Sequence, residues 1–129
     1  MVFKDSPAIY IQIALYVCEQ ILLKKWKPEE KIISIRDLGE LIEISPNTVQ
    51  RAYDFLQQKK IISNVRGIGF FVDPDAEESI LDFRREQFLE NELPETLRNL
   101  YLLKIDIQQV SELYEKFVKK NFPNKKRWN

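Results

Sequence analysis

The segment SPNTVQRAY, residues 45–53, constrains the fold more than any other part of the chain. Its serine is a favourable helix N-cap, and its proline suits the first helical position, where the missing N–H group costs no hydrogen bond. The pattern predicts an amphipathic helix that begins at Pro46, ends near Lys59 and carries polar side chains on its outer face. Apolar residues recur along it with the helical period, at Val49, Ala52, Tyr53 and Leu56.

Two further helices are predicted before this segment. Residues 7–25 repeat apolar side chains at three- and four-residue intervals, and Ser6-Pro7 supplies a cap at their start. Ser34 precedes Asp37 in a variant of the capping box, so a helix of about two turns should follow. The apolar face of this short helix contains Ile35, Leu38 and either Leu41 or Ile42.

The periodicity changes after the third predicted helix. Residues 61–65 and 70–72 are short strand candidates, and the turn between them contains Gly67 and Gly69. Two short strands around a glycine-bearing turn predict a β-hairpin. We therefore expect a hairpin to follow the three helices directly.

The second part of the chain is predicted to be entirely helical and to form a dimer. Asp73-Pro74-Asp75 interrupt the pattern, so we expect one domain in residues 1–75 and another in residues 76–129. Pro94 either kinks a helix or starts a new one, and Asp106 opens the last helix. So short a segment cannot bury its apolar stripe alone, whereas two copies packed together can. The expected dimerisation residues are Leu81, Phe88, Leu97, Leu100, Val110, Tyr114 and Phe117.

Composition excludes several classes of site. The chain has no histidine, a single cysteine (Cys18), and 20 acidic against 20 basic residues. Catalytic triads, imidazole metal ligands, cysteine clusters for zinc and internal disulfides are excluded. We expect no enzyme activity, no cofactor and no metal. The longest apolar run is shorter than the ~20 residues that cross a bilayer, so a cytoplasmic protein without membrane contact is the expectation.

Local charge and the order of elements predict a nucleic-acid partner. Residues 44–66 contain four cations and one anion, although the whole chain is neutral. The predicted elements follow the order of a winged helix-turn-helix: a helix, a short helix, a tight turn, a polar-faced helix and a hairpin. In that fold the third helix fits the major groove. The expected fold is therefore mainly α with a small β-hairpin wing. The positions suited to contact double-stranded DNA are Ser45, Asn47, Thr48, Gln50, Arg51, Arg66 and Gly67.

Four motifs occur in order along the chain: PAIYIQI, SIRDL, SPNTVQRAY and RGIGFFV. In order and spacing they resemble the GntR family of bacterial transcription regulators. The resemblance implies DNA contacts from Arg36 and from the seven positions named above. It also implies a sequence-specific regulator, expected to be a repressor, on a pseudo-palindromic operator. The short helical segment after Asp75 is similar to that of the YtrA-like subfamily, which implies a homodimer.

Several assignments have a structural alternative. Arg36 could pair with Glu40 along one helix, and the polar residues of the third helix could form an ordinary solvated face. Arg66 and Gly67 could serve the turn alone. A winged-helix module that binds protein rather than DNA is the alternative function.

Other residues have simpler expected roles. Cys18 is expected in the core, and Lys59 and Lys60 as charges at a helix end. Gly39 stands inside a helix where the family usually has alanine, which should cost up to ~1 kcal/mol. A small-molecule effector could bind between the two parts near Phe70, but no convergence of polar residues marks such a site.

Overall fold

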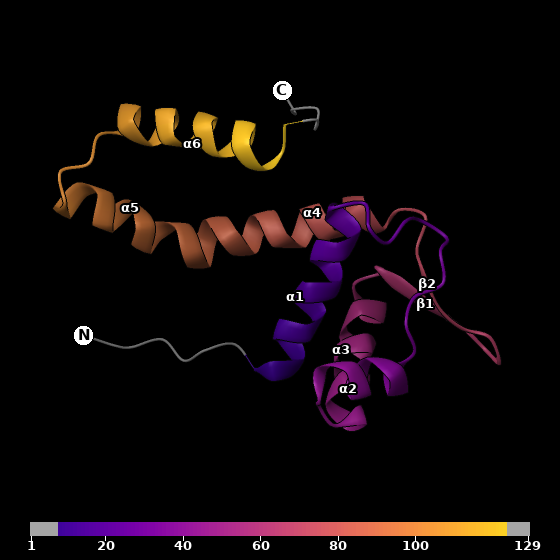
Figure 1. Cartoon of the computed structure of the whole chain (residues 1–129). Helices are drawn as coiled ribbons and strands as arrows, with labels where there is room; N and C mark the ends of the chain where they lie inside the picture. The colour runs from indigo at the N-terminus through magenta and orange to yellow at the C-terminus, as the bar shows by residue number, and fades with distance from the viewer. Residues whose placement is uncertain (1–7, 124–129) are drawn as a thin grey trace. The chain divides into compact units, whose positions relative to one another are not determined.

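The computed structural model describes residues 8–123, which divide after Arg84 into two compact units. The first, the N-terminal unit, contains three helices, a hairpin and the first part of a fourth helix (Figure 1). This order confirms the predicted mainly α fold with a small hairpin wing. The elements are α1 (Ile9–Leu22), α2 (Ile35–Ile42), α3 (Pro46–Gln58), β1 (Ile62–Val65), β2 (Gly69–Val72) and α4 (Ala76–Gln87).

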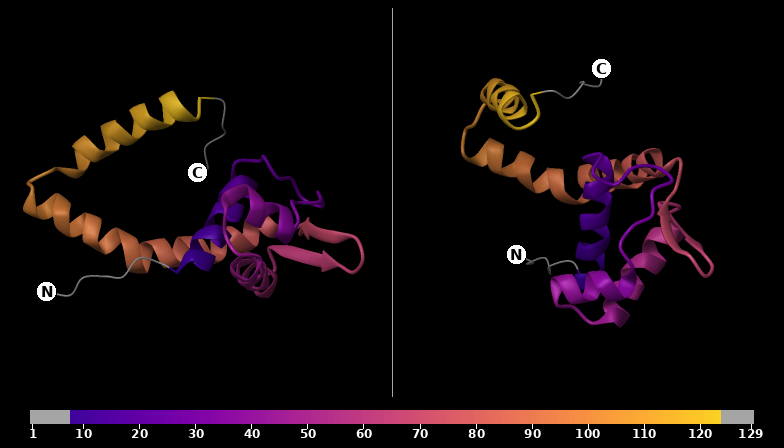
Figure 2. Two further views of the ribbon diagram at one scale, coloured as in Figure 1. Left: turned by 60° about the horizontal axis from the view of Figure 1, so that its bottom comes forward. Right: turned by 45° about the vertical axis from the view of Figure 1, so that its right-hand side comes forward.

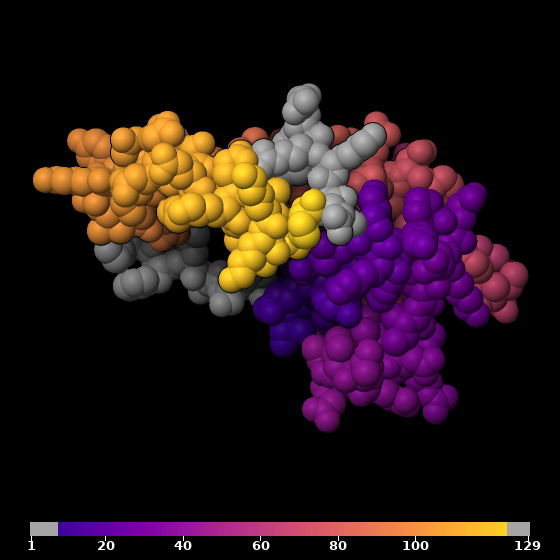
Figure 3. All heavy atoms as spheres, turned by 45° about the horizontal axis from the view of Figure 1, so that its top comes forward, coloured from indigo at the N-terminus to yellow at the C-terminus, as the bar shows by residue number. Residues whose placement is uncertain are grey.

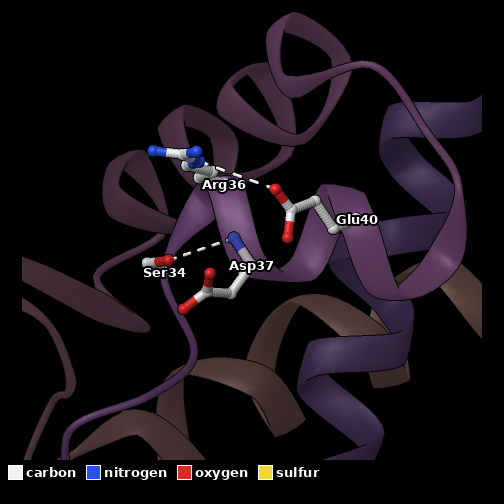
Figure 4. Close-up of polar contacts among 4 residues, drawn as sticks. All are labelled: Ser34, Arg36, Asp37 and Glu40. Carbon is white, nitrogen blue, oxygen red and sulfur yellow. Dashed lines mark hydrogen bonds and ion pairs between the residues drawn. The ribbon is translucent and has the colours of Figure 1, made fainter.

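Two serines cap the second and third helices as the sequence predicts. The Ser34 hydroxyl accepts a hydrogen bond from the backbone N–H of Asp37 at 3.1 Å, which fixes the start of α2 (Figure 4). The Ser45 hydroxyl accepts one from the backbone N–H of Asn47 at 3.2 Å, with proline in the first turn of α3. The cap predicted at Ser6-Pro7 lies outside the described residues, and α1 begins after Ala8.

The core of the N-terminal unit forms around α3. All four apolar residues predicted for the inner face of α3 are buried, and they pack with α1, α2 and the strands. Leu38 of α2 is buried, Ile42 packs against this core, and Leu41 is 69% exposed. Packing therefore selects Ile42 over Leu41 for the inner face. The buried residues of α1 are Ile13, Ala14, Val17, Cys18 and Ile21.

Gly39 differs from its expected role as a weak point of α2. It is buried, and a Cβ atom built on it would lie 2.8 Å from the carbonyl oxygen of Ile44. That carbonyl belongs to the turn between α2 and α3, whose approach leaves no room for a methyl group. The expectation that glycine costs stability relative to alanine considered helix propensity alone, and this contact with the turn opposes it.

The hairpin pairs β1 with β2 in antiparallel register, from Ile62 opposite Val72 to Val65 opposite Gly69. Its turn extends away from the three helices in both views of Figure 2. Residues 29–32 run along the other edge of β2, an arrangement the sequence did not predict. The Ile32 N–H donates to the Phe70 carbonyl at 2.9 Å, and the Val72 N–H donates to the Glu30 carbonyl at 3.0 Å.

The division between the two compact units falls within α4, after Arg84. Ala76 and Ile80 are fully buried and belong to the same core as α1 and α3. The start of α4 therefore completes the core of the N-terminal unit, so the chain remains part of that unit as far as Arg84.

The C-terminal unit begins at Arg85 and is helical throughout its elements. A π-helical turn, η1 (Phe88–Glu92), is followed by α5 (Leu93–Leu102) and α6 (Ile107–Asn121). Pro94 lies in the first turn of α5, so it starts a helix after a π-helical turn. Asp106 caps α6 in a full capping box with Gln109, whose side-chain oxygen accepts the Asp106 N–H at 3.2 Å. The Asp106 carboxylate also accepts the Gln108 N–H at 2.8 Å. Within residues 8–123, no helix combines the length and apolar character that crossing a membrane requires.

Candidate nucleic-acid interface

The first turn of α3 presents short polar side chains at an open helix end. Asn47 is exposed and Thr48 is half-buried, directly after the capping Ser45. The Asn47 side chain has no hydrogen-bond partner among the described residues. A helix N-terminus carries unpaired N–H groups and a partial positive charge, so it favours anions. This end of α3 can therefore receive a phosphate while its side chains reach beyond it.

Gln50 and Arg51 are exposed on α3, and each has a partner within its own chain. The Gln50 side-chain amide donates to the Asp54 carboxylate at 2.9 Å. The Arg51 guanidinium carbon lies 4.0 Å from the centre of the Tyr10 ring, a cation–π contact with α1. These side chains are therefore not simply solvated, and each is held in one direction on the helix surface.

Arg36 lies on α2 with 85% of its side chain exposed. Its Nε atom is 3.6 Å from a carboxylate oxygen of Glu40, one helical turn later (Figure 4). The structure thus contains the Arg36–Glu40 pair that the sequence offered as the structural alternative. Such exposed pairs contribute only ~0.3–0.5 kcal/mol, so a phosphate can displace the carboxylate from the guanidinium.

The hairpin turn carries Arg66 and Gly67, both exposed. Gly67 has a φ of 78°, a left-handed conformation that side chains disfavour. A Cβ built at this position would meet nothing within 4 Å, so the space beside the turn is open. The turn geometry therefore requires glycine and leaves the surface free for a close approach by another molecule.

Other positive charges near α3 have structural contacts. Lys59 is the C-cap of α3, and its ammonium nitrogen lies 5.7 Å from the ring centres of both Phe55 and Phe83. Lys60 follows with a φ of 61° at the end of the helix. Both lysines therefore belong to the end of α3, as predicted.

Cys18 is buried in the core of α1, as predicted. Burial raises the pKa of its thiol to about 12, an effect that the positive charge of Arg84 only partly offsets. A thiol with so high a pKa stays protonated and is a poor nucleophile at neutral pH.

Two features of this surface were missed in the sequence. Asp54 stands four residues after Gln50, and this helical spacing is a signal that could have identified the pair. Tyr10 meets Arg51 from a distant part of the chain, and no local pattern indicates that contact.

The expected dimerisation residues are distributed over α4, η1, α5 and α6. Leu81, on α4, is half-buried within the N-terminal unit. In the C-terminal unit, Leu100 and Val110 are half-buried, and no residue of α5 or α6 is buried. The remaining members of the set are exposed: Phe88, Leu97, Tyr114 and Phe117.

Comparison with known proteins shows which family the chain resembles. Residues 9–72 match the profile of bacterial regulatory proteins of the gntR family. A GntR-family regulator structure from Bacteroides thetaiotaomicron is 41% identical, with a TM-score of 0.67, and the match covers 88% of this chain and 98% of that one.

Two proteins of Bacillus subtilis are also similar. The transcriptional repressor YtrA is 28% identical over 84% of this chain and 83% of its own length. The uncharacterized transcriptional regulator YhcF is 33% identical over 58% of this chain, and the chain spans 62% of its length.

The region that matches the family profile, residues 9–72, contains α1, α2, α3 and the hairpin, the elements that form the surface described above. The chain therefore belongs to the GntR family of bacterial regulatory proteins, winged-helix transcription regulators that bind DNA.

Proposed function

We propose that this chain is a repressor that binds a pseudo-palindromic operator as a homodimer. The observation that carries the proposal is the exposed, serine-capped end of α3, whose polar side chains point away from the core. Asn47, Gln50 and Arg51 are all exposed there, while the opposite face of the helix is buried. A helix of this kind fits the major groove with its N-terminal residues against the base edges.

The chemistry of these side chains suits base recognition. Asparagine and glutamine can pair with adenine through two hydrogen bonds, and arginine can do the same with guanine. To make such contacts Gln50 must release Asp54, whereas Arg51 can remain stacked on Tyr10. Ser45 and Thr48, together with the helix N-terminus, suit a phosphate.

Two other elements support α3 in this proposal. Arg36 on α2 is suited to a phosphate or a guanine once Glu40 is displaced. Arg66 and Gly67 at the hairpin turn can approach the DNA backbone or the minor groove, because the space beside Gly67 is open. Contacts from these elements would fix the orientation of α3 on the duplex.

The C-terminal unit supplies the reason for a homodimer. Its helices have no buried residues, and several large apolar side chains of α5 and α6 are exposed. The side chains of α6, yellow in Figure 3, lie at the surface in that view. A second copy would cover these apolar faces and hold two α3 helices at half-sites ~34–36 Å apart or a little wider. The proposal includes a cytoplasmic location, because such a regulator must reach its operator there.

Selection of bound fragments from random DNA tests the proposal. The wild-type chain should enrich a two-fold symmetric sequence, and its affinity should fall steeply with salt, with a log–log slope of ~0.9 per phosphate contact. A variant with both Gln50→Ala and Arg51→Ala should lose this binding and keep its dimeric sedimentation. Gln58→Ala, at the other end of α3, is the matched control and should bind like the wild type.

The outcomes also separate the alternative function. Absence of any enriched sequence, or binding that does not respond to salt, would contradict the proposal. A protein partner lost in the double variant, with no DNA affinity in the wild type, would favour a protein-interaction module.

A further inference from the structure

The contact between Arg51 and Tyr10 differs in kind from the contacts of Arg36 and Gln50, the other two long polar side chains proposed to reach DNA from α2 and α3. Arg36 and Gln50 both face carboxylates, whereas Arg51 faces an aromatic ring. Among the described residues, no acidic side chain forms an ion pair with Arg51. A ring holds a guanidinium without neutralising it, so the full positive charge of Arg51 stays available to an anionic partner.

The Tyr10 ring is itself fixed in place. It is half-buried and packs against the core from the first turn of α1. Its centre lies 6.3 Å from that of Phe55 at an interplanar angle of 72°, an edge-to-face contact. Phe55 in turn meets Phe83 at 6.0 Å and 76°. The Tyr10 ring beneath Arg51 is therefore the outer member of a row of three aromatic side chains that pack against the core of the N-terminal unit.

We infer that Tyr10 is a positioning residue for DNA binding, which acts by holding the Arg51 guanidinium toward the duplex. The inference rests on the proposed function, since it requires Arg51 to contact DNA. An arginine that is already oriented loses less side-chain freedom on binding than one that moves freely in solvent. Tyr10 thus increases affinity for the operator without touching DNA itself.

The decisive experiment changes the electrostatics of the ring without changing its shape. Tyr10→Phe keeps the ring and its quadrupole, whereas pentafluorophenylalanine at the same position reverses the quadrupole. Operator affinity, measured by fluorescence anisotropy, should stay within about twofold for Tyr10→Phe and fall about three- to tenfold for the fluorinated side chain. Thermal unfolding of both proteins shows whether the fold is equally stable.

Two further variants separate positioning from general stability. Tyr10→Leu should weaken operator binding in the wild-type background, but should add nothing to the loss caused by Arg51→Ala. Tyr16→Leu is the matched control, because Tyr16 is an exposed tyrosine on the same helix, with an edge contact to Trp26 at 6.3 Å instead. It should leave operator affinity unchanged.

Each outcome decides one question. If the wild-type chain binds no operator, the proposed function fails. If the wild type binds and the fluorinated protein binds equally well, or if the Tyr10→Leu and Arg51→Ala losses are additive, then the positioning role is overturned. The comparison of the two isosteric rings still decides the matter if Tyr10→Leu does not fold.

Discussion

The phenolic hydroxyl of Tyr53 donates a hydrogen bond of 2.8 Å to the backbone carbonyl oxygen of Ile33. Ile33 directly precedes the N-cap of α2, so this bond joins the middle of α3 to the start of α2. The Tyr53 ring is fully buried and meets Phe70 of β2 edge-on, with the ring centres 4.9 Å apart. One side chain thus holds α3 against both α2 and the hairpin.

Removal of this hydroxyl should destabilise the N-terminal unit. Tyr53→Phe keeps the ring but leaves the Ile33 carbonyl without this donor, which should lower the free energy of unfolding by ~1–2 kcal/mol. Chemical denaturation followed by circular dichroism measures the change. Tyr101→Phe is the control, because Tyr101 is 84% exposed and should tolerate the change. Equal stability of the Tyr53→Phe protein and the wild type would show that the bond contributes nothing.

Alkaline pH should destabilise the chain partly through Cys18. Burial raises the pKa of this thiol from near 9 to about 12, so the folded state keeps its proton where the unfolded state loses it. The thiol's contribution to stability is therefore complete below pH 9 and declines as the pH rises toward 12. Between pH about 8 and about 10, the wild type should lose more unfolding free energy than Cys18→Ala. Parallel pH profiles for the two proteins would contradict this expectation.

Gly39→Ala should lower stability although alanine favours helices. The propensity gain is up to ~1 kcal/mol, but the added methyl group would lie 2.8 Å from the Ile44 carbonyl oxygen, a backbone atom that cannot simply rotate away. Overpacking of this kind costs typically ~1–3 kcal/mol, so the net effect should be a lower thermal midpoint. A higher midpoint for the variant would show that the turn between α2 and α3 shifts at little cost.

The features that could be predicted from the sequence are those set by neighbours along the chain. The caps at Ser34, Ser45 and Asp106 were predicted because each involves a side chain and a backbone group two or three residues apart. The inner face of α3 followed from its period, since a helix that packs on a core must repeat its apolar residues. Secondary structure and the exposed end of α3 were therefore accessible without coordinates.

The features that escaped prediction depend on contacts between distant segments. Leu41 and Ile42 are adjacent and similar in hydrophobicity, so only packing could show which one faces the core. Residues 29–32 are largely charged or polar, and their pairing with β2 uses backbone groups that carry no sequence signal. The contact of Arg51 with Tyr10 on α1 was not predicted either, because the two residues lie far apart in the sequence.

Loss of the charge on Glu40 should strengthen binding to DNA. Glu40→Gln frees the Arg36 guanidinium and also removes a negative charge from α2, so operator affinity should rise about two- to fivefold. Glu43→Gln is the matched control, because Glu43 is an exposed acid at the end of the same helix and forms no ion pair among the described residues. Anisotropy titrations at two salt concentrations measure both effects. Equal gains from the two variants would mean that only the overall charge matters.

A charge on the apolar face of α6 should dissociate the proposed dimer. Phe117 is 55% exposed in the single chain, and burial of a glutamate against a second copy would be strongly unfavourable. Phe117→Glu should therefore weaken the dimer on the order of 100-fold, measured by sedimentation velocity over a range of concentrations. Gln108→Glu adds the same charge to an exposed position of α6 and should stay dimeric. If Phe117→Glu sediments like the wild type at every concentration, this face is not the contact between copies.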